Sequence, residues 1–251
     1  MPLYRAELVD RGFYWRKRRL HDKSLVLYLP FDKDDGSYAR DRSGYNNHGV
    51  IYGATRVAGK VGDGLSFDGV DDYAKVEPFT VYGWSEITIA EWVYAVKPKA
   101  NPPWSKFGMI GDYWTDYPST FHSTNNLTDY TSLRAIWCTR KPDGTKGLYS
   151  YDWLSYVNQW VHIVRRFTAD REFSVWINGV KVYSATVPAT EKTVLEWNPD
   201  TATNPICYRR FVLGANSNLS EWMTCMNDEL RIYNRALTAE EIRRIMYMRG
   251  V

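Results

Sequence analysis

Short apolar runs separated by turn residues are the feature that most restricts the fold of this chain. Residues 173–177 and 181–187 are two such runs, and Asn178 and Gly179 lie between them. Asn-Gly favours a type I′ turn, because both central residues of that turn need a positive φ, and the pair therefore predicts a β-hairpin. Further runs of strand length occur at residues 24–31, 65–67, 87–96, 133–139, 160–167, 211–213 and 229–233. Many short strands of this kind predict an all-β, antiparallel β-sandwich.

One short helix is expected near the C-terminus. Thr238 and Glu241 have the spacing of a capping box, in which each side chain accepts a hydrogen bond from the backbone of the other residue. Ile242, Ile245 and Met246 follow at helical spacing and predict an apolar side that packs on the sandwich.

The chain of 251 residues divides into an N-terminal arm, residues 1–23, and one domain, residues 24–251. Sandwiches of about 200–250 residues commonly form a single domain. The arm holds large apolar side chains and the basic run Arg16–Arg19, with seven basic and three acidic residues in total. We expect it to pack on a neighbouring subunit, in a homo-oligomer or a larger assembly. The rest of the chain is nearly neutral, so nucleic acid is not the expected partner.

Two long segments, residues 97–132 and 188–209, are rich in proline and are expected to form loops. No secretory signal follows Met1, and no apolar run of about 18 residues predicts a membrane span. The cysteines are Cys138, Cys207 and Cys225. We expect three buried thiols, although a bond between Cys207 and Cys225 stays open.

Five motifs along the chain match one known family. They lie within residues 25–32, 41–49, 59–73, 160–179 and 227–242, and the last of them is the closest match. Together they resemble the laminin-G-like jelly rolls of the concanavalin A-like lectin and glucanase superfamily, over roughly residues 24–248. The resemblance implies a non-catalytic module that binds carbohydrate or builds a surface structure, as lectins, adhesion domains and virion structural proteins do. It also implies a place outside the cell or on the surface of a particle or virion. The fold alone does not decide among these functions.

The resemblance further implies a structural calcium ion. Related jelly rolls often hold one near the pairing of their first and last strands, which would place Asp32, Asp41 and Asp228 at the site. Carboxylate oxygens are ligands that Ca²⁺ prefers. The alternative is that each aspartate caps the backbone of its own turn.

An enzyme is the alternative class. The segment from Glu86 to Glu91 resembles the active-site strand of laminarinase-like glycoside hydrolases on the same fold, in which two glutamates act as nucleophile and general acid. Thr88 stands where those enzymes have an aspartate. Residues five apart also lie on opposite faces of a regular strand, so the pair would need a bulge. We therefore expect no catalysis here.

Aromatic residues make up 16% of the chain and gather in two stretches. The ligand-binding residues expected there are Trp104, Tyr113, Trp114, Tyr117, Trp153 and Tyr156. Flat rings with a few polar neighbours suit a sugar. The same rings could instead fix loops to the sandwich or contact a neighbouring protein subunit. A glycan and a neighbouring subunit are therefore both expected partners.

Overall fold

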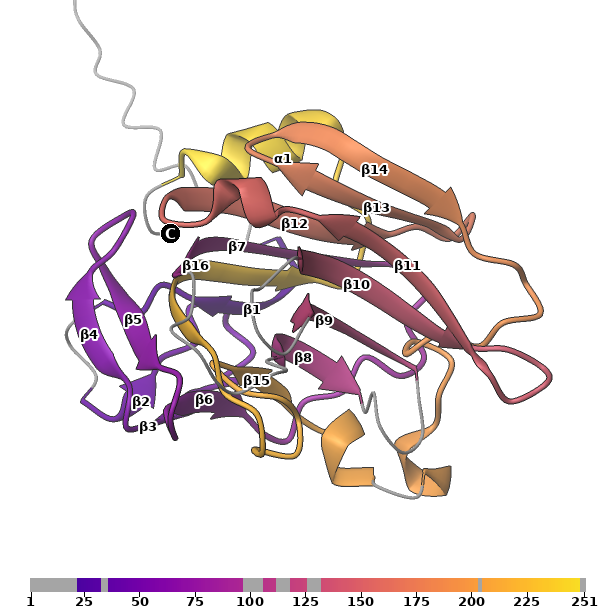
Figure 1. The fold of residues 1–251 in the computed structure, drawn as a ribbon, viewed down its shortest axis with the longest axis horizontal. Coiled ribbons are helices and arrows are strands. Elements are labelled where there is room, and N and C mark those ends of the chain that lie inside the picture. The colour runs from indigo at the N-terminus through magenta and orange to yellow at the C-terminus, as the bar shows by residue number, and fades with distance from the viewer. Residues whose placement is uncertain are drawn as a thin grey trace, which may run out of the picture.

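The computed structural model describes residues 22–32, 36–96, 106–111, 118–125, 132–202 and 205–248. Their strands form two antiparallel sheets that pack face to face, which confirms the expected β-sandwich (Figure 1). The N-terminal arm falls almost entirely outside the described residues, so its contact with a neighbouring subunit stays a prediction.

The first sheet holds eight strands of the described chain. They are β1 (Leu25–Leu29), β4 (Thr55–Ala58), β5 (Asp63–Asp68), β7 (Ile87–Ala95), β12 (Trp160–Phe167), β13 (Glu172–Ile177), β14 (Val180–Thr186) and β16 (Thr224–Tyr233). Their order is β14-β13-β12-β7-β16-β5-β4, and β1 also pairs with β16. Asn178 and Gly179 join β13 to β14 with φ of 49° and 79°, which confirms the predicted hairpin.

The second sheet has the order β11-β10-β9-β8-β15-β6-β3-β2. Its strands are β2 (Tyr38–Ala39), β3 (Gly49–Tyr52), β6 (Tyr73–Val76), β8 (Lys106–Gly111), β9 (Ser119–Asn125), β10 (Ser132–Arg140), β11 (Lys146–Asp152) and β15 (Phe211–Leu213). The prediction of a loop over residues 97–132 was wrong at β8 and β9. Pro118 directly precedes β9, a position where proline removes no hydrogen bond from the ladder.

The core lies between the sheets and is built by alternation along the strands. On β7, Ile87, Ile89 and Val93 point inward and are fully buried. From the other sheet, Trp137 stacks on Phe167 with ring centroids 4.7 Å apart. Large flat side chains thus fill the space between the two layers.

Helix α1 (Ala239–Met246) lies on the outer side of the first sheet (Figure 1). Its predicted capping box is present, with Glu241 N donating to Thr238 Oγ1 and Thr238 N donating to Glu241 Oε2. The helix buries an apolar cluster that contains Tyr28, Ala90, Val164, Trp176, Tyr233, Ile242 and Ile245. In the described part of the chain, no helix is long and apolar enough to cross a membrane.

Three short 3₁₀ helices complete the described elements. They are η2 (Leu154–Tyr156), η3 (Pro199–Thr201) and η4 (Pro205–Tyr208). The last two belong to the proline-rich segment 188–209, whose described residues form no strand, as predicted. This segment forms one wall of the groove described next.

Candidate functional site

A groove of about 610 Å³ lies where three connections meet: residues 40–48, 77–86 and the segment that contains η3 and η4. It is lined by Val26, Tyr45, Asn47, Pro78, Phe79, Thr80, Tyr82, Trp84, Asn198, Pro199, Asp200, Arg209 and Asn234. We call it the Tyr82 groove. Its lining combines aromatic rings, three asparagines and one pair of opposite charges.

Three aromatic side chains of the Tyr82 groove are open to solvent to different extents. Tyr45 is 50% exposed and Tyr82 is 44% exposed, whereas Trp84 is half-buried. The Trp84 ring packs edge-on against Phe79, with centroids 6.3 Å apart. The Tyr45 hydroxyl donates to Lys23 O at 2.6 Å, which fixes the direction of that ring.

Backbone hydrogen bonds hold two walls of the groove together. Phe79 N donates to Arg209 O at 2.6 Å, and Gly83 N donates to Leu195 O at 2.8 Å. The loop of residues 77–86 is therefore tied at two points to the segment across from it. The site is therefore preformed, and binding a ligand would cost little conformational entropy in these loops.

The polar side chains of the groove are only partly satisfied by the described residues. Asn47 Nδ2 donates to Val26 O at 2.7 Å, and Asn198 Oδ1 accepts from Asp200 N at 2.9 Å. Asn47 Oδ1 and Asn198 Nδ2 have no partner among the described residues. Arg209 pairs with Asp200 at the rim, where both side chains are exposed. Donors and acceptors are thus available beside the aromatic rings.

The sequence of residues 68–243 matches the family described as the concanavalin A-like lectin/glucanases superfamily. The chain belongs to this superfamily. The match confirms the resemblance drawn from the motifs. Among curated proteins, no sequence matches the chain.

Among the solved structures with the same fold are several binding domains. The receptor binding domain of botulinum neurotoxin D has a TM-score of 0.64 at 14% identity, over 90% of this chain and 52% of that one. The serotype D ligand binding domain in complex with N-acetylneuraminic acid has a TM-score of 0.63 at 14% identity, over 89% and 50%. The binding domain of Paraclostridial Mosquitocidal Protein 1 has a TM-score of 0.61 at 16% identity, over 90% and 52%. The chain spans about half the length of these structures, and the likeness shows the fold alone.

The structure describes two of the six aromatic ligand residues expected from the sequence. Trp153 is fully buried, so its expected role as a surface platform was wrong. Tyr156 is partly buried and packs against the core. Trp104, Tyr113, Trp114 and Tyr117 lie outside the described residues. The rings of the Tyr82 groove were missed, although Tyr82-Gly83-Trp84 between two predicted strands was the available signal.

Glu86 and Glu91, the two glutamates of the hydrolase-like segment, do not form a hydrolase site. Glu91 is fully buried between the sheets, where its carboxylate binds Arg165, His122 and Asn227. Glu86 lies just before β7 and accepts from the backbone N–H groups of Ala169 and Ala236, both at 3.1 Å. The Glu91 carboxylate lies in the core and the Glu86 carboxylate fixes two loops, so the carboxylate pair that the glycoside hydrolase alternative requires is not formed by these residues.

The aspartates expected to bind calcium accept hydrogen bonds from backbone N–H groups. Asp41 accepts from the N–H groups of Tyr28, Ser43 and Asn47 and from the Ser43 hydroxyl, which occupies both of its oxygens. Asp228 Oδ2 accepts from Val61 N at 2.7 Å. Asp41 thus caps the backbone of its own turn, the alternative to metal binding, whereas Asp228 binds the backbone of a turn that is distant in the sequence.

Asp32 Oδ1 contacts the same turn as Asp228, because it accepts from Asp63 N at 3.3 Å. The two carboxylates therefore clamp the β4–β5 hairpin at two backbone positions. Asp32, Asp41 and Asp228 do not form a set of three adjacent carboxylates, and the expected ligand set was wrong.

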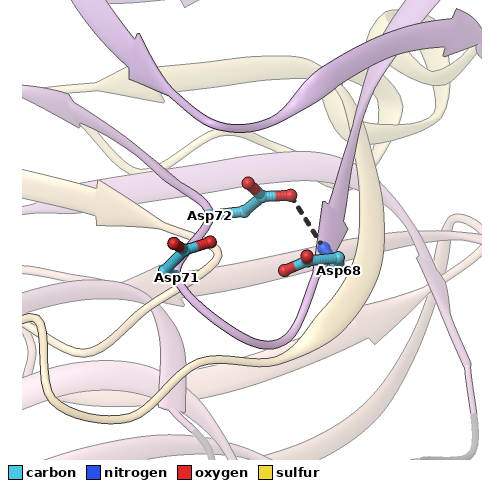
Figure 2. Close-up of side chains that lie close together, drawn as sticks. All are labelled: Asp68, Asp71 and Asp72. Atoms are coloured by element: carbon cyan, nitrogen blue, oxygen red, sulfur yellow. Dashed lines mark hydrogen bonds between the residues drawn. The ribbon is translucent and has the colours of Figure 1, made fainter.

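Among the described residues, one group of three carboxylates has oxygens within 4.8 Å of one another. Figure 2 shows this group, Asp68, Asp71 and Asp72, around the turn that joins β5 to β6. Asp72 Oδ2 accepts from Asp68 N at 3.0 Å, and Asp68 Oδ1 accepts from Val70 N at 2.8 Å, so both side chains hold the turn. Burial raises the pKa of Asp72, and the two neighbouring carboxylates add to the effect. Calcium binding stays a prediction.

Two of the three cysteines are described as free thiols. Cys138 and Cys225 are both buried. Because Cys225 is a free thiol, it does not form the bond with Cys207 that the sequence left open. Burial raises the pKa of Cys138 to about 12, which keeps this thiol protonated and unreactive.

Proposed function

We propose that this domain is a carbohydrate-binding module and that the Tyr82 groove is its glycan site. The observation that carries the proposal is the pair of half-exposed tyrosine rings, Tyr45 and Tyr82, beside asparagine side chains with unused polar atoms. The apolar C–H face of a sugar stacks on such rings, and its hydroxyls need donors and acceptors nearby. That one structure of the same fold is a complex with N-acetylneuraminic acid supports the proposal.

In the proposed complex, a sugar ring lies against Tyr82 while its hydroxyls bond to Asn47 Oδ1 and Asn198 Nδ2. Arg209 and Asp200 offer a donor and an acceptor at the rim. The site needs no acid or base, because it breaks no bond in the ligand. A module of this kind acts where glycans are displayed, outside the cell or on the surface of a particle, and this location is part of the proposal.

We expect Tyr82→Ala to weaken glycan binding about tenfold, because losing an aromatic contact costs roughly 0.5–1.5 kcal/mol and 1.4 kcal/mol is a factor of ten. A glycan array identifies the ligand, and isothermal titration calorimetry then compares the two proteins. Tyr38→Ala is the matched control, because Tyr38 is 58% exposed on β2 and does not line the groove.

Equal binding by the Tyr82→Ala and Tyr38→Ala variants would contradict the proposed site. The competing hypothesis is that the groove is a contact between subunits. A native mass measurement that showed an oligomer, dissociated by Tyr82→Ala, would favour that assembly role and overturn glycan binding at this groove.

A further inference from the structure

A second groove, of about 530 Å³, lies on the outer face of the first sheet, beside the end of α1. It is lined by Lys60, Val61, Trp92, Trp160, Asn178, Met246 and Tyr247. We call it the Lys60 groove. It shares no residue with the Tyr82 groove, and no sequence motif pointed to it.

The floor of the Lys60 groove is aromatic. Trp160 pairs with Tyr94 across β12 and β7, with ring centroids 5.8 Å apart, and His162 pairs with Trp92 at 5.3 Å. Of these four rings, Trp92 and Trp160 line the groove, and Tyr94 and His162 pack beside them. Tyr247, which follows the helix, is 78% exposed at the rim. The groove therefore offers flat apolar surfaces on its floor and at one side.

Lys60 is the one charged residue among those that line the groove. Its Nζ lies 4.8 Å from the centroid of the Trp92 ring. Within the described chain, no carboxylate lies within ion-pair distance of this ammonium group. An unpaired cation over an aromatic floor favours a ligand that carries a negative charge.

The hairpin that carries Lys60 is held against the sheet. The Asp228 carboxylate, on β16 next to Trp92, accepts from Val61 N at 2.7 Å. A Cβ at Gly59 would lie 2.7 Å from Asp228 Oδ2, so the backbone approaches this carboxylate closely. The Asp228 carboxylate thus fixes the backbone of the turn that carries Lys60.

Asn178 supplies a neutral polar group at the opposite edge. Its Oδ1 accepts from His162 N at 3.0 Å, which orients the side chain and leaves Nδ2 without a partner among the described residues. An amide donor and a cation that line the same groove are suited to hydroxyl and carboxylate oxygens.

We propose that the Lys60 groove binds an acidic sugar, a saccharide ring that carries a carboxylate. The ring stacks on the exposed parts of Trp160 and Tyr247, the Lys60 ammonium pairs with the carboxylate, and Asn178 Nδ2 donates to a ring hydroxyl. The two grooves are independent, so this site can fail while the Tyr82 groove binds its glycan, and the reverse also holds.

The test compares two small probes that differ only at C6, methyl β-D-glucuronide and methyl β-D-glucoside. Nuclear magnetic resonance titration of the full chain is expected to show tighter binding of the glucuronide, with shifts at the Trp160 indole and weaker binding as salt is added. Lys60→Gln is expected to weaken glucuronide binding about tenfold and to leave the glucoside unchanged, because only the charge-assisted bond is lost.

Lys181→Gln is the matched control. Lys181 lies over Trp176 on the same sheet, pairs with Glu172 and does not line the groove, so its loss is expected to leave binding unchanged. Equal loss in the Lys60→Gln and Lys181→Gln variants would overturn the proposal, because it would show a general effect of charge. Equal affinity for the two probes, or no saturable shift at Trp160 with the glucuronide, would overturn it as well. Tyr82→Ala tests the other groove and is expected to leave glucuronide shifts at Trp160 intact.

Discussion

Glu91→Gln is expected to lower the free energy of unfolding by about 3–5 kcal/mol, the typical cost of removing one partner from a buried ion pair. Glu91 and Arg165 are each about 1% exposed at the side chain, and their Oε1 and Nη2 atoms lie 3.2 Å apart. Arg165 stays protonated at any accessible pH, so the amide would leave a buried guanidinium without a counter-charge. Urea denaturation of the two proteins at neutral pH measures the difference.

The charge of Glu91 at neutral pH follows from its partners. Burial by itself raises the pKa of this carboxyl, but the hydrogen bond from His122 and the charge of Arg165 outweigh it and hold the pKa below its usual range. The carboxylate is therefore ionised in the folded protein.

Two controls accompany the Glu91 prediction. Glu86→Gln removes a partly exposed carboxylate that accepts two backbone hydrogen bonds, and we expect a cost of only about 1 kcal/mol. The double variant Glu91→Leu with Arg165→Met removes both charges and is expected to be more stable than Glu91→Gln. A Glu91→Gln variant as stable as the Glu86→Gln variant would show that no buried ion pair stabilises this core.

His162→Phe is expected to make the protein more resistant to acid. Between pH 7 and pH 5, the free energy of unfolding of the variant is expected to fall by about 2 kcal/mol less than that of the natural sequence. His162 is 1% exposed, and neither ring nitrogen has a hydrogen-bond partner among the described residues. Burial, and then the charge of Arg231, lowers the pKa of His162 from 6.5 to about 3. The folded protein thus keeps this ring neutral where the unfolded chain protonates it.

The sign follows from the protons bound in each state. Below the unfolded pKa of 6.5, the unfolded chain binds one more proton at His162 than the folded protein does. Stability contributed by the neutral ring is therefore complete above pH 6.5 and is lost as the pH falls toward the folded pKa of about 3. Phenylalanine does not bind a proton in either state, so the stability of the variant does not depend on pH at this position.

The His162 prediction compares the pH dependence of stability in two proteins, because other groups change the free energy of unfolding in the opposite direction as the pH falls. Burial raises the pKa of Asp228 to about 7, and this carboxyl stabilises the folded state as the pH falls. Its effect cancels when the variant and the natural sequence are compared. Trp92→Phe changes the ring beside His162 without changing a titrating group, and its cost is expected to be equal at both pH values. The same pH dependence in the His162→Phe variant and the natural protein would contradict the neutral, buried histidine.

Local features of the fold were predictable because each depends on neighbours along the chain. The turn at Asn178 and Gly179 needs positive φ at two adjacent residues, and the capping box needs two side chains three residues apart. Short apolar runs bounded by turn residues indicated that β12 and β13 are strands. By contrast, β8 and β9 were hidden by prolines near their ends, because proline excludes a strand only at positions that must donate to the ladder.

The role of Glu91 could not be predicted from β7 itself. The strand is apolar on both faces, so no alternation indicated which way the carboxylate points. Its partners, His122 on β9 and Arg165 on β12, lie 31 and 74 residues away along the chain. The sequence therefore argued against catalysis at this strand but did not indicate a buried ion pair.

The sequence by itself determined the sandwich and the C-terminal helix, because turn residues, apolar strand runs and capping act over a few residues. Its motifs also indicated the superfamily. Only the tertiary structure decided where the grooves lie. The Tyr82 groove joins residues from 26 to 234, and the Lys60 groove joins the turns of two hairpins to the end of α1. Whether an aromatic side chain is covered, as Trp153 is, or left open, as Tyr82 is, depends on which distant segments pack over it. Contacts between segments that are distant in the sequence decide this exposure, and no periodic pattern in the sequence indicates it.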